Sequence, residues 1–128
     1  MLNESGQAVL VVEDDDDIRS TVALALELEG YRVCLASNGL EALTITRTRN
    51  DIGLIFLDLM MPVMDGRRFL EEYRGSAEST GIPIVVLTAA GERQCPEGAR
   101  ELVNKPLDLE NLLATARRYV HCETAVST

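Results

Sequence analysis

The stretch IGLIFLDLMMPVMDG, residues 52–66, contains the two signals that decide the fold. Its first six residues form an almost uninterrupted apolar run, which is typical of a strand buried on both faces of a parallel sheet. Asp58 follows that run directly, and the pair Asp65-Gly66 indicates a turn that opens a helix extending to about Arg74. A buried strand followed by a helix is the repeating unit of an α/β fold.

The same alternation extends to both sides of this stretch. Four further apolar runs predict strands at residues 9–12, 32–36, 84–87 and, more weakly, 102–103. Helices are expected from Asp15–Asp17 to about Glu29, after a cap at Ser37 or Asn38, and after a cap at Asp108. We therefore expect a flavodoxin-like, doubly wound α/β fold, with a five-stranded parallel sheet in the order 2-1-3-4-5.

One helix of this pattern is incomplete. Residues 89–98 follow the fourth predicted strand, and they are too few and too poor in apolar side chains for a full helix. We expect this fourth helix to be truncated or replaced by a loop. No repeat or linker divides the chain, so we expect a single domain over residues 1–128, with its core from about 7 to 121 and both termini frayed.

The composition is that of a globular protein. Apolar residues make up 46% of the 128 residues and charged residues 26%, and no apolar run is long enough to cross a bilayer. The net charge of −9 argues against a nucleic-acid surface, because phosphate binding needs clustered Lys and Arg. The three cysteines lack metal-ligand spacing, and the first eight residues do not have the pattern of a signal peptide. We therefore expect a cytoplasmic location, reduced thiols and no membrane partner.

Polar residues that could carry chemistry stand at the ends of the predicted strands. Glu13 and Asp14 follow the first strand, Asp58 the third and Thr88 the fourth, and Lys105, the only lysine of the chain, comes just after the fifth. Because such sheets bind ligands at the carboxyl ends of their strands, these side chains are expected to converge. Each residue alone is explained as a helix cap, a turn former or a surface group. These ordinary roles do not explain why one such residue or pair follows each of four predicted strands.

The residue types in this set predict phosphoryl chemistry. Three carboxylates at close range repel one another unless a cation lies among them. Oxygen ligands without a nearby His or Cys favour a hard ion, Mg²⁺ or Mn²⁺. Asp58 would then lie between that cation, the Lys105 ammonium and the Thr88 hydroxyl. This arrangement is suited to forming an acyl phosphate on Asp58.

Four segments resemble the motifs of response regulator receiver domains of two-component signalling, and the match covers nearly the whole chain. They are VLVVEDD at residues 9–15, LDLMMPVMDG at 57–66, VLTA at 86–89 and NKPL at 104–107. The resemblance implies that Asp58 accepts a phosphoryl group from a sensor histidine kinase or a histidine phosphotransfer protein. The phosphorylated form would then alter the binding of a downstream protein.

The same resemblance implies roles for the other site residues. Asp14, Asp58 and the backbone carbonyl of Met60 would ligate Mg²⁺, with Glu13 acting mostly through water. Thr88 and Lys105 would contact the phosphoryl group, and the peptide bond between Lys105 and Pro106 would be cis.

Two features depart from the family pattern, and both fall on the surface that most receivers use for output. The segment 88–98 is shorter than usual, and Leu102 stands where Tyr or Phe is common. Only seven residues follow His121, so the resemblance is to a stand-alone receiver rather than to one with an effector domain.

Alternative functions differ from this one in the residues that they require. A phosphatase of the haloacid dehalogenase class needs a second aspartate two residues after its nucleophile, where this chain has Met60. We therefore expect that the protein is not an enzyme and that it catalyses only its own phosphorylation and dephosphorylation. A phosphorelay intermediate or phosphate sink would use the same residues, and the sequence does not separate these from a regulatory receiver. A module that binds partners without phosphorylation is disfavoured by the intact set of site residues.

Overall fold

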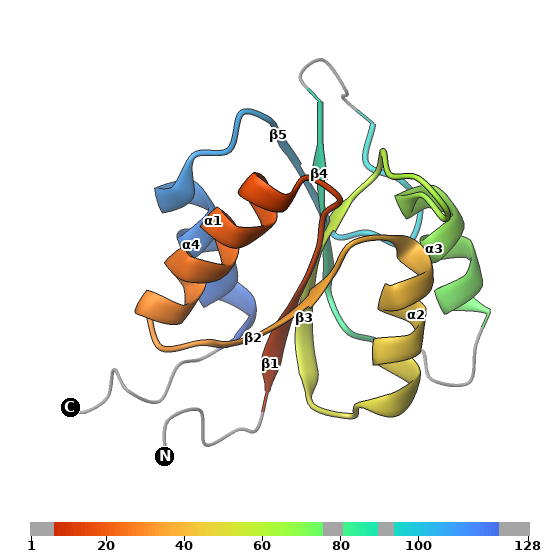
Figure 1. The fold of residues 1–128 in the computed structure, drawn as a ribbon, viewed down its shortest axis with the longest axis horizontal. Helices are drawn as coiled ribbons and strands as arrows, with labels where there is room; N and C mark the ends of the chain where they lie inside the picture. The colour runs from red at the N-terminus through yellow and green to blue at the C-terminus, as the bar shows by residue number, and fades with distance from the viewer. Residues whose placement is uncertain (1–6, 76–80, 90–93, 121–128) are drawn as a thin grey trace.

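The computed structural model describes residues 7–75, 81–89 and 94–120, and it contains a five-stranded sheet between two layers of helices (Figure 1). In chain order the elements are β1 (Ala8–Val12), α1 (Asp16–Leu28), β2 (Arg32–Ala36), α2 (Gly39–Thr48), β3 (Ile52–Asp58), α3 (Gly66–Arg74), β4 (Ile84–Thr88), β5 (Glu101–Asn104) and α4 (Leu109–Tyr119). Helices α1 and α4 cover one face of the sheet, and α2 and α3 cover the other.

All strand pairs are parallel and the order is β2-β1-β3-β4-β5, which confirms the predicted flavodoxin-like topology. β1 and β3 are neighbours, with Val12 opposite Leu57. The residues that follow Val12 and Leu57 therefore reach the same edge of the sheet. This edge is the switch point at which such folds place their ligands.

The sheet has a core on each face. β1 and β3 are buried along their whole length, as their continuous apolar runs predict. Val11 and Phe56 pack toward α1 and α4, whereas Leu10 and Ile55 pack toward α2 and α3. Full burial of each such side chain stabilises the fold by about 1.5–3 kcal/mol, so the two central strands form a rigid base for the residues at their ends.

Each described helix begins at a side chain that accepts a hydrogen bond from an N–H of the first turn. These N-cap residues are Asp15, Asn38, Asp65 and Asp108. For α2 the cap is Asn38 rather than Ser37, whose backbone N–H and hydroxyl instead donate to Glu41. Leu43 of this helix is buried, but Leu40 is 51% exposed.

No helix occurs in the described residues between β4 and β5, which are Ala89 and residues 94–100; residues 90–93 lie outside the described part. Instead the N–H of Ala99 donates to the carbonyl of Pro96, which closes a turn with Gly98 at φ 100°. Glycine suits this position because a positive φ strains other residues. The turn is held to the end of α3 by an ion pair between Arg74 and Glu97 at 3.2 Å.

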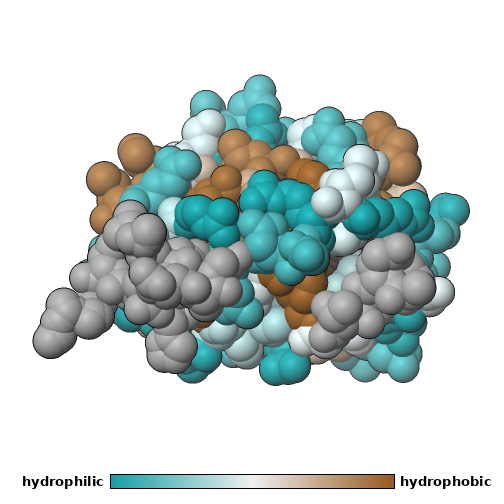
Figure 2. Space-filling view, turned by 90° about the horizontal axis from the view of Figure 1, so that it is seen from below, coloured by the Kyte–Doolittle hydropathy of each residue, from teal (hydrophilic) through white to brown (hydrophobic). Residues whose placement is uncertain are grey.

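The opposite edge of the sheet, where the strands begin, has a mostly hydrophilic surface with separate hydrophobic areas (Figure 2). Of the helices in the described ranges, none has the length and apolar character needed to cross a membrane.

Candidate functional site

Five side chains singled out in the sequence come from four neighbouring strand ends. Glu13 and Asp14 follow β1, Asp58 ends β3 and Thr88 ends β4. Lys105 follows β5 directly. The strand order brings all five to the carboxyl edge of the sheet, and β2, the outer strand next to β1, adds no side chain to this set.

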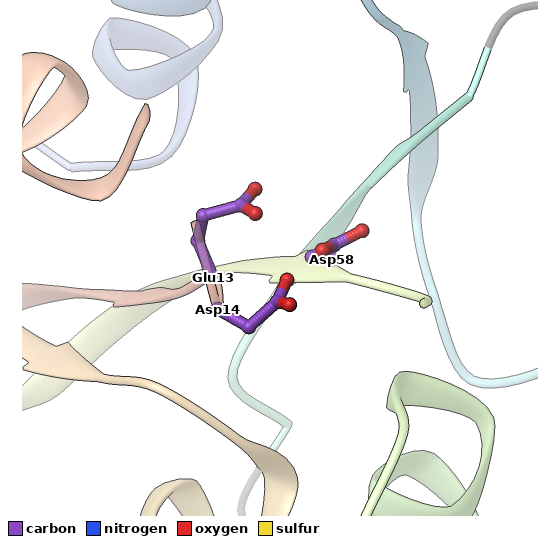
Figure 3. A group of neighbouring side chains, drawn as sticks. All are labelled: Glu13, Asp14 and Asp58. Atoms are coloured by element: carbon purple, nitrogen blue, oxygen red, sulfur yellow. The ribbon is translucent and has the colours of Figure 1, made fainter. Parts of the chain in front are cut away.

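The three carboxylates form a compact cluster. One oxygen from each of Glu13, Asp14 and Asp58 can be chosen so that all three lie within 4.8 Å of one another. Figure 3 shows Asp14 reaching from the end of β1 toward Asp58 at the end of β3. Glu13 is fully buried and Asp58 is 3% exposed, whereas Asp14 is exposed. The cluster is therefore open to solvent through Asp14.

Lys105 supplies the positive charge of the site. Its Nζ donates to Oε1 of Glu13 at 3.0 Å and lies 3.6 Å from Oδ1 of Asp58. Burial acts to lower the pKa of Lys105, but the hydrogen bond to Glu13 and the charges of both carboxylates outweigh it, so that this pKa is raised. The ammonium is therefore held in its charged form beside Asp58.

Asp58 is poised between protonation states in the cation-free protein. Burial first, and the charge of Glu13 second, raise its pKa to about 7, although the charge of Lys105 and the N–H of Met60 oppose this rise. The Met60 N–H donates to Oδ1 of Asp58 at 3.3 Å. A positive charge added to the cluster would favour the ionised carboxylate.

The backbone around Glu13 is fixed from several directions. Its N–H donates to the carbonyl of Ala36, and its Oε2 accepts a hydrogen bond from the N–H of Asp15. Arg19 of α1 donates from Nη1 to the Glu13 carbonyl at 2.8 Å. Sequence reasoning missed Arg19, because an arginine inside an acidic first turn looks like an ordinary helix-surface residue.

The end of β4 is linked to the segment that contains Lys105. The Lys105 N–H donates to the carbonyl of Thr88 at 2.7 Å, and the Asn104 side chain donates to the carbonyl of Ala89 at 3.1 Å. The Lys105-Pro106 peptide bond is cis. Thr88 is 3% exposed. The ends of β4 and β5 therefore form one hydrogen-bonded unit next to Asp58.

The donor set fits a hard divalent cation. Every side-chain ligand in the cluster is a carboxylate oxygen, and the described residues place no His or Cys among them. Such sets suit Mg²⁺, which keeps several waters and needs few protein oxygens. The exposed position of Asp14 leaves room for those waters. A cavity of about 340 Å³ is lined by residues of α1 and by Lys105, Pro106, Leu107 and Leu109, and it does not include Glu13, Asp14 or Asp58.

Comparison with known proteins identifies the family. The model of the response regulator receiver domain matches residues 9–117. The chain therefore belongs to the response regulator receiver domains, which act in two-component signalling.

Three similar proteins illustrate the match. The DNA-binding dual master transcriptional regulator RpaA of Synechocystis sp. is 33% identical over 114 residues, which are 85% of this chain and 47% of RpaA. The chain spans about half the length of the curated relatives it matches. The chemotaxis protein CheY4 of Vibrio cholerae is 33% identical with a TM-score of 0.77, over 89% of this chain and 98% of CheY4. Response regulator TrrA of Thermotoga maritima, solved with Mg²⁺-BeF, is 30% identical with a TM-score of 0.76, over 88% of this chain and 97% of TrrA.

Proposed function

We propose that Asp58 accepts a phosphoryl group from a phosphohistidine of a sensor histidine kinase or a histidine phosphotransfer protein. One observation carries this proposal. A buried carboxylate at the end of a central strand lies 3.6 Å from an ammonium and within 4.8 Å of two further carboxylates. This arrangement places the nucleophile beside an ammonium that can neutralise charge on a transferring phosphoryl group, and beside two carboxylates that can help to hold a cation for the same purpose.

In the transfer, a carboxylate oxygen of Asp58 attacks the phosphorus while the P–N bond to the imidazole breaks. The electron pair of that bond stays on the imidazole nitrogen, and the product is an acyl phosphate on Asp58. Lys105 offsets the negative charge of the phosphoryl oxygens, and the Thr88 hydroxyl donates a hydrogen bond to one of them. Because Glu13 holds Lys105 through a 3.0 Å hydrogen bond, Glu13 also positions the ammonium.

Mg²⁺ would be held by Asp14, Asp58 and the Met60 carbonyl, with Glu13 acting mostly through water. When bound, it supplies positive charge that stabilises the ionised Asp58 and the phosphoryl oxygens. The presence of Mg²⁺-BeF in the TrrA structure supports this proposal. Mn²⁺ has a similar preference for oxygen ligands, and its binding here stays a prediction.

Phosphorylation of Asp58 would alter the binding of a downstream protein in the cytoplasm. A phosphorelay intermediate or a phosphate sink would use the same phosphoryl transfer to Asp58. The expected absence of nucleic-acid binding also stays a prediction. It rests on the net charge of −9.

The test is phosphorylation by acetyl phosphate and Mg²⁺, followed by intact-mass measurement. The parent protein should gain one phosphate, and Asp58→Asn should gain none. Asp65→Asn is the matched control, because Asp65 caps α3 in the same segment and Asn can also cap a helix. Equal labelling of Asp58→Asn would place the phosphorylated residue elsewhere. A phosphotransfer screen against purified histidine kinases of the host then identifies the protein donor.

A further inference from the structure

Arg19 of α1 contacts the peptide unit that joins two members of the carboxylate cluster. Its Nη1 donates to the carbonyl of Glu13 at 2.8 Å, and its Nη2 donates to the carboxylate of Asp16. That carbonyl belongs to the peptide bond between Glu13 and Asp14, and peptide bonds are planar. The hydrogen bond from Arg19 therefore fixes the orientation of this whole peptide unit. The Arg19 side chain is 18% exposed, so most of it is covered by the protein.

Charge alone gives little reason for an arginine at this position. Arg19 is the fourth residue of α1, and the first turn of a helix favours negative over positive charge. Its ion-pair partner Asp16 has a side chain that is 84% exposed, and such ion pairs contribute little to stability. A positive charge near the carboxylate cluster also repels a bound cation. The hydrogen bond to the Glu13 carbonyl is the contact that gives Arg19 a role at the site.

The end of β1 is held on both sides of Glu13. The Glu13 N–H donates to the Ala36 carbonyl at 3.0 Å, which fixes the peptide unit before Glu13. Arg19 fixes the peptide unit after it, directly before Asp14. Asp14 reaches from the end of β1 toward Asp58 (Figure 3), and its carboxylate oxygen lies within 4.8 Å of one from Asp58. The direction of the Asp14 side chain therefore depends on the peptide unit that Arg19 holds.

We propose that Arg19 is a positioning residue of the cation site, which aims Asp14 at Asp58 by fixing the peptide unit before Asp14. This inference rests on the cation site of the proposed function, but it does not require phosphoryl transfer. Arg19 has two effects on cation binding, and they have opposite signs. Its charge weakens binding, whereas its hydrogen bond strengthens binding by holding a ligand in place. Contacts that orient metal ligands change affinity by about ten- to a hundredfold, whereas solvent and salt screen the charge, so the hydrogen bond should dominate.

The experiment measures Mg²⁺ affinity by calorimetric titration without a phosphodonor. Arg19→Lys and Arg19→Met introduce side chains of nearly equal length, but only lysine has a positive charge and can donate a hydrogen bond. Mg²⁺ should bind most tightly to the parent and less tightly to Arg19→Lys. It should bind to Arg19→Met about tenfold more weakly than to the parent. This order should persist at about 0.5 M salt, where the effect of the charge is screened.

Two further measurements separate positioning from a general loss of structure. In the cation-free protein, the nuclear magnetic resonance order parameter of the Asp14 amide should fall in Arg19→Met, whereas that of Val11 in β1 should not. Labelling of Asp58 by acetyl phosphate at saturating Mg²⁺ should stay within about threefold of the parental rate, because only cation binding is weakened. An equal fall at Val11, or slow labelling at saturating Mg²⁺, would mean a general loss of structure and would overturn the inference.

Arg117→Met is the matched control. It removes an arginine whose side chain is 57% exposed on α4 and which pairs with Glu29 at the end of α1, so Mg²⁺ affinity should stay parental. Binding of Mg²⁺ by Arg19→Met at least as tightly as by Arg19→Lys would overturn the inference, because the hydrogen bond would then not outweigh the charge. Parental Mg²⁺ affinity in both Asp14→Ala and Arg19→Met would overturn the proposed cation site and this inference together. Weak binding by Asp14→Ala with parental binding by Arg19→Met would overturn the inference alone.

Discussion

The ammonium of Lys105 lies closer to Glu13 than to Asp58, at 3.0 Å from the Glu13 carboxylate against 3.6 Å from that of Asp58. Glu13 is fully buried, so its charge needs a partner inside the protein. Lys105 therefore has two tasks. It compensates the buried Glu13 and it provides positive charge for Asp58.

Replacement of Lys105 by arginine should be far from conservative. A planar guanidinium is wider than an ammonium and cannot take the same place between two carboxylates. We expect Lys105→Arg to slow the labelling of Asp58 by acetyl phosphate at least about tenfold, since lost charge stabilisation in a site typically costs that much or more. The control is Arg117→Lys, an exposed exchange of the same two residue types on α4. Rates of Lys105→Arg within twofold of the parent would contradict this role.

Asp14 should control cation binding without supporting the fold. It is exposed, and it lies within 4.8 Å of two like charges. Asp14→Ala should weaken Mg²⁺ binding by at least about tenfold and abolish labelling at low Mg²⁺, while thermal stability stays equal or rises. Calorimetric titration and a melting curve measure both effects. Asp108→Ala, which removes an exposed helix-capping aspartate instead, should lower stability but leave Mg²⁺ affinity unchanged. Parental Mg²⁺ affinity in Asp14→Ala would place the ion elsewhere.

The raised pKa of Asp58 predicts a pH-dependent stability in the cation-free protein. The folded state keeps the Asp58 proton up to about pH 7, whereas the unfolded chain loses it near about pH 4. Between these values the folded state binds the additional proton, so the free energy of unfolding falls as the pH rises, by up to about 1.4 kcal/mol per pH unit.

Asp58→Asn should remove this dependence and be more stable than the parent at pH 8. Urea unfolding in the presence of a chelator, at pH values from 5 to 8, measures the slope for each protein. Mg²⁺ should reduce the slope of the parent, because the cation favours the ionised carboxylate. Parallel stability profiles for the parent and Asp58→Asn would show that Asp58 does not titrate in this range.

Much of the fold could be predicted because strands β1, β3 and β4 are almost continuously apolar and the helices carry strong caps. Asp108 was predicted as the cap of α4, and the pair Asp65-Gly66 as a turn that opens α3. Both aspartates are N-caps in the structure, and a capping side chain is readable locally because it acts on adjacent N–H groups. Tyr31 and Thr46 are buried although no periodic pattern indicated it. Their burial depends on packing between elements, which a local pattern does not encode.

The candidate site could be predicted in its members but not in its contacts. Strand order alone brings Glu13, Asp58 and Lys105 to one edge. That Lys105 pairs more closely with Glu13, and that Arg19 donates to the Glu13 carbonyl, depends on side-chain conformations and burial. Both are properties of the assembled structure.

The acyl phosphate on Asp58 should be long-lived. Its hydrolysis requires a water held in line behind the phosphorus. Met60, two residues beyond Asp58, has a side chain that cannot orient water by a strong hydrogen bond. Met60→Asn should therefore shorten the half-life of the acyl phosphate at fixed Mg²⁺ several-fold. The largest decrease expected is to about a tenth of the parental half-life. Met60→Leu is the apolar control. Decay of the parent within seconds, unchanged by Met60→Asn, would mean that another group positions the water.

Phosphorylation should change the segment from Ala89 to Gly98, of which residues 90–93 lie outside the described part of the structure. The phosphoryl oxygens would attract the Thr88 hydroxyl. The carbonyls of Thr88 and Ala89 accept hydrogen bonds from the Lys105 N–H and the Asn104 side chain. In receivers with Tyr or Phe at position 102, that ring is expected to rotate on phosphorylation and pass the signal on. Leu102 has no ring or hydroxyl and packs against the core on the α2–α3 side, so it cannot act in this way.

We therefore expect the signal to pass along the backbone after Thr88 and to raise the hydrogen-exchange protection of residues 89–98. Exchange is measured by mass spectrometry with and without acetyl phosphate and Mg²⁺. Asn104→Ala should weaken the change, because it removes the hydrogen bond to the Ala89 carbonyl, and Asp58→Asn should abolish it. Arg74→Ala, which frees only the turn at residues 96–99 from α3, should lower protection there in both forms. Equal protection of residues 89–98 before and after phosphorylation of the parent would contradict this route and favour a signal carried by another surface.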